Sequence, residues 1–406
     1  MNRKWRVVYL GLLVSALAVA LGVWKPLKPA KAKGGSAAPR YRVDPSWPKP
    51  LPVEATQINP ATGKPKPWVT GEVAGTCTDS RDHVFTVNRG NLISPETVTA
   101  VASPPVLEYD REGNIVNAWG NRNVLPNGLH GCFVDFQDNV WIAGNGDGIV
   151  QKYAHNGNGP LLQIGTRGVC DNPPANTCGN SAANPAANQS KTLLNQPPDM
   201  AIDPSNGDIY VADGYGNHRV VVFDKNGVYL RQWGNSGLGP GQFQPADGGH
   251  PHAIAISKDG LVYATDRGSD RVQVFEKNPT NCAGTGGNRV CQPVQIIPIK
   301  PGTGNFPNPF GVPALGTAGS AWDVDFSIDK AQTFLFDTDG GNEILWTLNR
   351  RSGSILSGFG RPGHQSGEFT FLHTLALDSK GNLFTGETIN GRRIQKFVRA
   401  DDDDDD

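Results

Sequence analysis

Three of the eight histidines in this sequence recur at almost equal intervals. His130 and His252 are 122 residues apart, and His252 and His373 are 121 residues apart. Each lies five residues before a polar residue that closes a run of alternating apolar residues, namely Asp135, Ser257 and Asp378. Imidazole nitrogens are common metal ligands, and three protein ligands with an open position are typical of catalytic zinc sites. We therefore interpret the three histidines as one metal site, with zinc as the first candidate and iron or copper as alternatives.

The elements that must position these histidines are strands of an internal repeat. In the two clearest copies, residues 201–213 and 253–266, an alternating strand, a turn that contains glycine and a second strand follow one another, and a third strand comes next. Weaker copies cover residues 75–87, 131–143, 323–337 and 374–386, which makes six units. Alternating runs of this kind bury both faces only against neighbouring sheets. The pattern therefore predicts an all-β fold, a six-bladed β-propeller.

The three histidines fall on alternate units of this predicted ring. Their slot in the second, fourth and sixth units is filled in the other units by Ala74, Pro198 and Trp322. The inner strands of a propeller line its central channel, so equivalent side chains on alternate blades should converge on the axis. The sequence thus predicts three imidazoles around an approximate threefold axis. His83, His155 and His364 lie in turn-like contexts and are assigned no role.

The ends of the chain differ in character from the repeats. Residues 1–32 combine a basic start, an apolar stretch at 7–24 and an Ala-Lys-Ala sequence at 30–32, which is typical of a signal peptide or a membrane anchor. We expect export to the periplasm or the extracellular space. If the N-terminal segment is an anchor rather than a cleaved signal peptide, residues 7–24 would hold the protein at the membrane. Residues 33–71 are interpreted as a linker that contains a strand able to close the ring, Arg40–Val43, and residues 72–400 as the propeller. The acidic run 401–406 is expected to be a solvated tail.

Composition and cysteine spacing agree with an exported β protein. The chain has 50 Gly and 32 Pro among 406 residues, which favours short elements joined by tight turns, and its net charge of −1 does not favour a nucleic-acid partner. Cys170 and Cys178 bracket one loop and Cys282 and Cys291 another, so each pair could close a short surface loop by a disulfide. Cys77 and Cys132 lie in strand patterns, where a bridge and two buried thiols are both open.

Motifs between residues 195 and 275 carry a family resemblance. They read Gln-Pro-Pro-Asp at 196–199, Val-Ala-Asp-Gly-Tyr-Gly-Asn-His-Arg at 211–219, Gln-Trp-Gly at 232–234, Pro-Gly-Gln-Phe at 240–243 and Pro-His at 251–252. In this order the motifs resemble peptidyl-α-hydroxyglycine α-amidating lyase and, more broadly, the NHL-type propellers. Weaker similarity extends from about residue 73 to residue 397.

The resemblance implies roles for five residues. His130, His252 and His373 match the zinc ligands of the lyase, Tyr215 matches its tyrosine, and Arg89 matches its arginine. In such an enzyme a carbinolamide loses its hydroxyl proton and its C–N bond breaks, leaving an aldehyde and an amide. Zinc would serve as Lewis acid for the hydroxyl, a phenolate at Tyr215 would accept the proton, and Arg89 would stabilise that phenolate and bind a substrate carboxylate. The expected partner is a small-molecule or peptide-derived substrate.

Two other functions compete with this interpretation. The chain could be a binding propeller that uses its loops for a protein or a polysaccharide, as many NHL proteins do. It could also be a lactonase of the calcium-dependent six-bladed type, for which only Asp199 and Asp323, one place beyond the histidine slot, offer similar ligands. The amidating lyases also bind structural calcium through an Asp that follows the third histidine. Thr374 occupies that position here, so a structural calcium is not expected.

Overall fold

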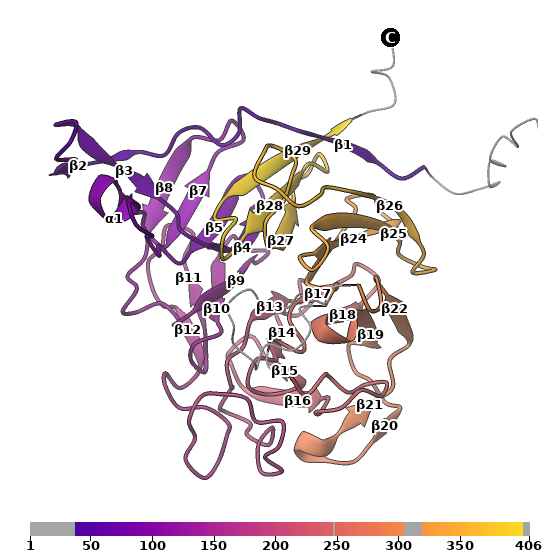
Figure 1. Ribbon diagram of the computed structural model, residues 1–406. Helices are drawn as coiled ribbons and strands as arrows, with labels where there is room; N and C mark the ends of the chain where they lie inside the picture. The colour runs from indigo at the N-terminus through magenta and orange to yellow at the C-terminus, as the bar shows by residue number, and fades with distance from the viewer. Residues whose placement is uncertain (1–36, 247, 304–318, 401–406) are drawn as a thin grey trace, which may run out of the picture. The chain divides into compact units, whose positions relative to one another are not determined.

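The computed structural model describes residues 37–246, 248–303 and 319–400, and all of its named strands belong to one unit of the chain that begins at Ala38. Within these residues lie six antiparallel sheets of four strands each (Figure 1). The predicted all-β, six-bladed β-propeller is therefore confirmed. The expected signal or anchor segment, residues 1–32, and the acidic tail, residues 401–406, lie outside the described residues.

Each blade is a meander that runs from the innermost to the outermost strand. The first three blades comprise β4 (Val73–Thr78), β5 (Val84–Asn88), β7 (Val106–Tyr109) and β8 (Ile115–Trp119); β9 (Leu129–Val134), β10 (Val140–Gly144), β11 (Ile149–Tyr153) and β12 (Leu162–Gly165); and β13 (Asp199–Ile202), β14 (Ile209–Asp213), β15 (Arg219–Phe223) and β16 (Tyr229–Trp233). The next two comprise β17 (Ile254–Ile256), β18 (Leu261–Asp266), β19 (Arg271–Glu276) and β22 (Gln295–Pro298); and β23 (Asp323–Phe326), β24 (Phe334–Asp339), β25 (Ile344–Asn349) and β26 (Ile355–Phe359).

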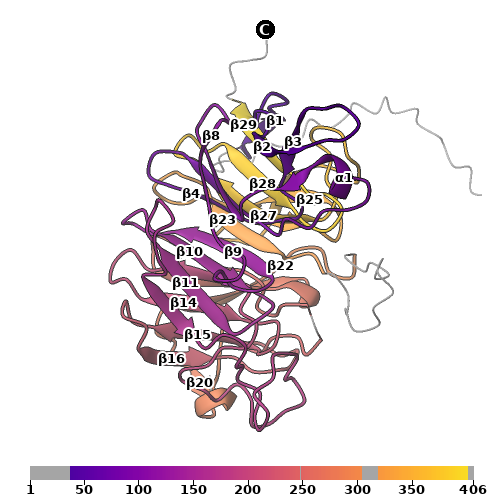
Figure 2. The same cartoon turned by 90° about the vertical axis from the view of Figure 1, so that its left-hand side faces the viewer.

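The sixth blade contains strands from both ends of the unit. It consists of β27 (Leu372–Leu377), β28 (Leu383–Glu387), β29 (Ile394–Ala400) and β1 (Arg40–Val43). The strand β1 pairs antiparallel with β29, with Arg40 opposite Ala400 and Val43 opposite Phe397, and the two strands lie side by side in Figure 1. The innermost strands contact one another in the cyclic order β4, β9, β13, β17, β23, β27 and again β4. Figure 2 shows β27 and β28 beside β4, where the ring closes.

Short elements lie outside the blades. They are β2 (Val53–Ile58), β3 (Pro65–Val69), β6 (Val101–Ala102), β20 (Cys282–Ala283), β21 (Val290–Cys291), the helix α1 (Glu96–Thr99) and two 3-10 turns, η1 (Arg267–Ser269) and η2 (Gly286–Asn288). The strands β2, β3 and β6 form a small sheet of their own. The sequence pattern does not indicate β2 and β3, because Pro and Lys interrupt the alternation between residues 60 and 67.

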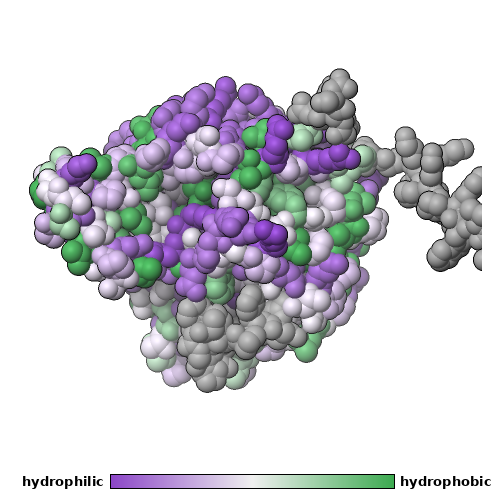
Figure 3. Space-filling model, turned by 45° about the horizontal axis from the view of Figure 1, so that its top comes forward, coloured by the Kyte–Doolittle hydropathy of each residue, from purple (hydrophilic) through white to green (hydrophobic). Residues whose placement is uncertain are grey.

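The hydrophobic core is divided among the junctions between blades. In β14, Tyr210 and Ala212 face a cluster shared with the fourth blade, while Ile209 and Val211 face a cluster shared with the second. The period of two in a strand directs successive side chains to opposite faces, so every blade is buried on both sides. On the face shown in Figure 3, hydrophilic and hydrophobic residues are interspersed.

Three disulfides join the six cysteines. The predicted pairs Cys170–Cys178 and Cys282–Cys291 are both present. Cys77 and Cys132, which the sequence leaves open, are bridged and connect β4 to β9 across two blades. Disulfides persist in oxidising compartments, so the set indicates an oxidising, exported environment. No helix among the described residues is long and apolar enough to cross a membrane, and residues 7–24 lie outside that set.

Candidate metal centre

The structure brings His130, His252 and His373 together in the channel, as their spacing predicts. His130 is the second residue of β9, His373 is the second residue of β27, and His252 lies two residues before β17. One ring nitrogen from each of the three lies within 4.8 Å of the others. The ring centroids are 4.5 to 5.0 Å apart, and each residue is at most 2% exposed. Three buried imidazoles that converge in this way form a group that could hold a metal ion.

Hydrogen bonds to neighbouring blades orient two of the imidazoles. Nδ1 of His252 lies 2.7 Å from the carbonyl oxygen of Trp322. A carbonyl oxygen only accepts, so Nδ1 carries the proton and Nε2 presents its lone pair. That Nε2 atom and Nδ1 of His373 are buried and have no hydrogen-bond partner. The His373 ring in turn bonds to the backbone of Ala74. Because unpartnered buried nitrogens are costly, the residues present fit a bound metal ion.

Electrostatics keep these rings neutral. Burial lowers the pKa of all three histidines well below the usual value, and nearby positive charge lowers it further. The cations that act on them are Arg89 and Arg267. Neutral imidazoles are the form that binds metal, so these nitrogens are available as ligands at neutral pH.

Tyr215 reaches the same site on the loop that follows β14. An added Cβ would collide with the Pro251 carbonyl oxygen at Gly214 and with the Asn195 side chain at Gly216, so only glycine permits this close approach. The Tyr215 hydroxyl lies 3.3 Å from Nε2 of His130. The loop thus holds a phenol directly beside one of the three imidazoles.

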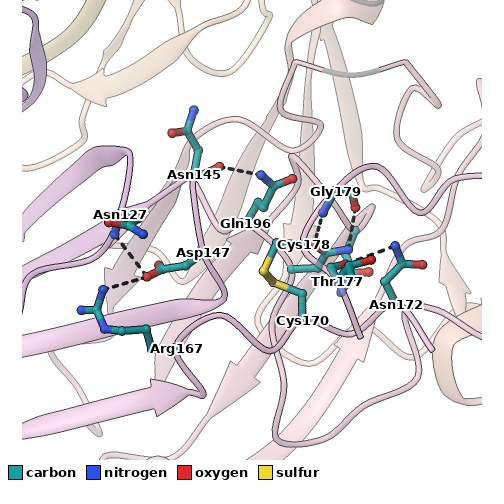
Figure 4. Close-up of a disulfide and its surroundings, with 12 residues drawn as sticks. Asn127, Asn145, Asp147, Arg167, Cys170, Asn172, Thr177, Cys178, Gly179 and Gln196 are labelled. Atoms are coloured by element: carbon teal, nitrogen blue, oxygen red, sulfur yellow. Dashed lines mark hydrogen bonds and ion pairs between the residues drawn. A yellow bond between two sulfur atoms is a disulfide. The ribbon is translucent and has the colours of Figure 1, made fainter. Parts of the chain in front are cut away.

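A long loop between β12 and β13 supports the Tyr215 loop. Figure 4 shows Cys170, Cys178 and Gln196 of this supporting loop. The Cys170–Cys178 disulfide closes part of it, and the Nε2 atom of Gln196 donates to the Asn145 carbonyl oxygen at 2.9 Å. The Gln196 carbonyl accepts from the Tyr215 backbone N–H, and the Ser181 hydroxyl donates to the Gly216 carbonyl at 2.7 Å. The backbone groups of Tyr215 and Gly216 are therefore both held by hydrogen bonds with the loop between β12 and β13.

Arg267 is a site residue that the sequence prediction missed. It begins η1, directly after β18, and only 7% of it is exposed. Its guanidinium lies over the Trp322 ring at 4.4 Å and over the Tyr215 ring at 5.9 Å, and its side chain hydrogen-bonds Tyr215. Burial lowers the pKa of Arg267, and Tyr215 opposes that shift. The repeat contains a signal that could have identified Arg267. Asp213 and Asp266 occupy equivalent positions at the ends of their second strands, and Tyr215 and Arg267 each follow within two residues.

Arg89 lies beside the channel but is held by other groups. Its Nη1 atom forms an ion pair with Glu72 at 2.5 Å, and its Nε atom donates to the Leu129 carbonyl at 3.0 Å. Its charge reaches His130 and His373, as their lowered pKa values show. The guanidinium in contact with Tyr215 is that of Arg267.

A cavity of about 170 Å³ continues the channel along the inner strands. His130 and His252 line it, together with Asp199 and Asp323 and the Cys77–Cys132 bridge. Asp199 accepts a hydrogen bond from the Ile254 N–H, and Asp323 accepts one from the Leu375 N–H, both at 3.0 Å. Burial raises the pKa of each carboxyl, and for Asp199 the charge of Asp323 adds to this. These two carboxyl groups thus connect neighbouring blades, the third to the fourth and the fifth to the sixth.

The residue after the third histidine also makes a contact between blades. The hydroxyl of Thr374 lies 3.0 Å from the hydroxyl of Thr76 on the first blade. A neutral threonine pair stands where the resemblance would require a carboxylate for calcium.

Fold and site together define a six-bladed β-propeller with a three-histidine group in its channel. The family model described as NHL repeat matches residues 194–223 and 249–275. These segments include β14 and β18, the strands that lead to Tyr215 and Arg267.

Two kinds of relatives are similar to the chain. NHL repeat-containing protein 3 of Mus musculus is 27% identical over 383 residues, which cover 89% of this chain and 84% of the relative. Peptidyl-alpha-hydroxyglycine alpha-amidating lyase 1 of Drosophila melanogaster is 30% identical and covers 70% of this chain, and peptidylglycine alpha-amidating monooxygenase of Rattus norvegicus is 27% identical and covers 51%. The matches span 47% and 21% of those two relatives. The resemblance inferred from the motifs is therefore confirmed.

Proposed function

We propose that this protein is an exported, zinc-dependent lyase that cleaves the C–N bond of a carbinolamide-type substrate in the propeller channel. The observation that carries the proposal is the convergence of three neutral imidazoles, two of which present unpartnered buried nitrogens, with a phenol 3.3 Å from the third. Similarity to the amidating lyases supports the same reaction class.

Each residue of the site has a role in this reaction. His130, His252 and His373 hold the metal ion, which supplies a Lewis acid for the hydroxyl oxygen of the substrate. Tyr215 as phenolate takes the hydroxyl proton, and the electron pair of the O–H bond forms the new carbonyl while the C–N bond breaks. The departing amide nitrogen takes this proton from the Tyr215 hydroxyl, which regenerates the phenolate, so a neutral amide and an aldehyde leave.

The two arginines stabilise negative charge in different places. Arg267 contacts the Tyr215 ring and hydrogen-bonds that residue, so it stabilises the phenolate. Arg89 lies at the channel with 24% of its side chain exposed. We assign it the substrate carboxylate, which it would bind alongside Glu72.

Metal analysis combined with turnover tests the proposal. The purified protein should contain zinc and should release glyoxylate from N-benzoyl-α-hydroxyglycine. His252→Ala should lose one equivalent of metal and all detectable turnover, while His364→Ala, a change outside the channel, should alter neither. A wild-type protein that binds no metal under zinc-replete conditions would overturn the metal centre. A metal-loaded protein without turnover would overturn the lyase assignment and leave a binding propeller as the alternative.

A further inference from the structure

A second cluster of metal-binding side chains lies where the first and second blades meet. Asp79 follows β4, Glu108 is in β7, and His155 follows β11. One ligand atom from each lies within 4.8 Å of the others. The carboxylates are almost fully buried, with side-chain exposures of 0% for Asp79 and 4% for Glu108, whereas His155 is 25% exposed. The cluster is therefore a buried acidic pair with a histidine at its solvent side.

Comparison of the six blades shows that the histidine is an exception. The residue two places after the aromatic or apolar residue near the end of the third strand is, in chain order, Arg111, His155, Lys225, Lys277, Arg350 and Arg399. Three of the basic residues form an ion pair with a nearby Asp: Arg111 with Asp82, Lys277 with Asp203 and Arg350 with Asp259. At this position a side chain with a permanent positive charge is sufficient to form the ion pair with Asp. The second blade instead has a side chain with a nitrogen lone pair.

The contacts of His155 cannot all be satisfied at once. Its Nε2 atom lies 2.9 Å from Oδ2 of Asp79 and 2.6 Å from Nη2 of Arg81. The carboxylate requires this nitrogen to donate a proton, and the guanidinium requires it to accept one. One nitrogen cannot do both, so the arrangement leaves one of these contacts unfavourable in either protonation state.

Nη2 of Arg81 occupies the position that a cation would take. It lies 2.9 Å from Asp79 and 3.0 Å from Glu108, in addition to its short contact with His155. The Arg81 side chain is 53% exposed and can swing into solvent.

Neighbouring residues already orient the ligands. Nδ1 of His83 lies 2.7 Å from Oε1 of Glu108, and Phe85 contacts the His155 ring edge to face with 5.1 Å between centroids. A partner that holds a ligand carboxylate in place is typical of metal sites.

We propose that Asp79, Glu108 and His155 form a second metal site, specific for zinc or a similar transition-metal ion, that Arg81 occupies when no metal is bound. Two carboxylates and an imidazole suit zinc better than calcium, which prefers oxygen ligands alone. The ion would join the first blade to the second, at the end of β4 away from the histidine slot. His83 acts as a positioning residue for Glu108.

Zinc titration by calorimetry of the wild type and three variants tests this inference. His155→Lys is the decisive variant, because lysine is present at the equivalent position of the fourth blade, where it pairs with Asp203. It should keep the ion pair with Asp79 and the thermal stability, yet lose one zinc ion relative to the wild type. Arg81→Gln removes the competing cation and should bind this zinc roughly tenfold more tightly.

Arg361→Gln is the control for Arg81→Gln. Arg361 follows β26, is 73% exposed and pairs with Glu368 at 2.6 Å, so its loss should leave both zinc affinities unchanged. The acidic run 401–406 is common to all variants and cancels in the comparison. An unchanged zinc stoichiometry in His155→Lys would refute the site, and so would weaker zinc binding in Arg81→Gln. Because the channel histidines are intact in every variant, failure here would leave the proposed lyase site untouched.

Discussion

Replacement of Tyr215 by phenylalanine isolates the proposed proton acceptor. The variant retains the ring that packs against Gly249 and contacts the rings of His130 and His252. It loses the hydroxyl, and with it the contact with Nε2 of His130 and the hydrogen bond to Arg267. The fold, the three imidazoles and the metal content should stay the same.

The expected loss of activity follows from these contacts. General-base catalysis by a positioned side chain commonly contributes about 10²- to 10⁴-fold, so kcat should fall by that factor. This corresponds to roughly 3–5 kcal/mol of transition-state stabilisation. Losing the hydrogen bonds of one hydroxyl should cost about 1 kcal/mol of stability. The effect on turnover should thus greatly exceed the effect on folding, and KM should change little because the hydroxyl acts on the reacting proton.

The assay measures glyoxylate release from N-benzoyl-α-hydroxyglycine, with zinc content and thermal unfolding recorded on the same samples. Tyr210→Phe is the matched control: its hydroxyl also contacts an arginine, Arg231, at 2.6 Å, but it lies in the core between the third and fourth blades. That variant should lose some stability and keep its kcat. An unchanged kcat in Tyr215→Phe, with metal still bound, would show that Tyr215 is structural and that the proton goes elsewhere.

Two further predictions concern charged groups in and beside the channel. Arg267→Met should lower kcat about 10²-fold, with Arg267→Lys recovering only part of it because lysine lacks the planar group that stacks on Trp322; steady-state kinetics of both variants would contradict this if methionine and lysine behaved alike. Burial raises the pKa of Asp325 to about 6, whereas an Asp in the unfolded chain has a pKa of about 4. As the pH rises from about 4 to 6, the unfolded state releases this proton while the folded state retains it. The free energy of unfolding therefore falls through that window. Asp325→Asn removes this dependence and should therefore gain up to about 2 kcal/mol relative to wild type between pH 4.5 and pH 7, measured by denaturant unfolding in EDTA; a difference independent of pH would contradict it.

The sequence by itself determined the repeat, the blade number and the meeting of the three histidines. Periodic strands bury both faces only against copies of themselves, so the number of units set the number of blades. His130, His252 and His373 occupy the same place in their inner strands, and equivalent places on alternate blades must converge on the axis. The position of a residue within its strand can be read from the local sequence, and the approximate symmetry of the ring then determines where that residue lies in space. Tyr215 was assigned through the resemblance to the amidating lyases, and the glycines on both sides of it permit the close approach to His130.

Only the tertiary structure decided which groups surround that histidine centre. Arg89 and Arg267 both follow second strands, and a long side chain after a turn can point in several directions, so the sequence did not show that Arg267 contacts Tyr215 while Arg89 pairs with Glu72. The Cys77–Cys132 bridge and the contacts of His155 likewise join different blades. Such contacts depend on the distance between two blades and on the path of each loop, quantities that arise from the packing of the whole ring rather than from any local pattern of residues.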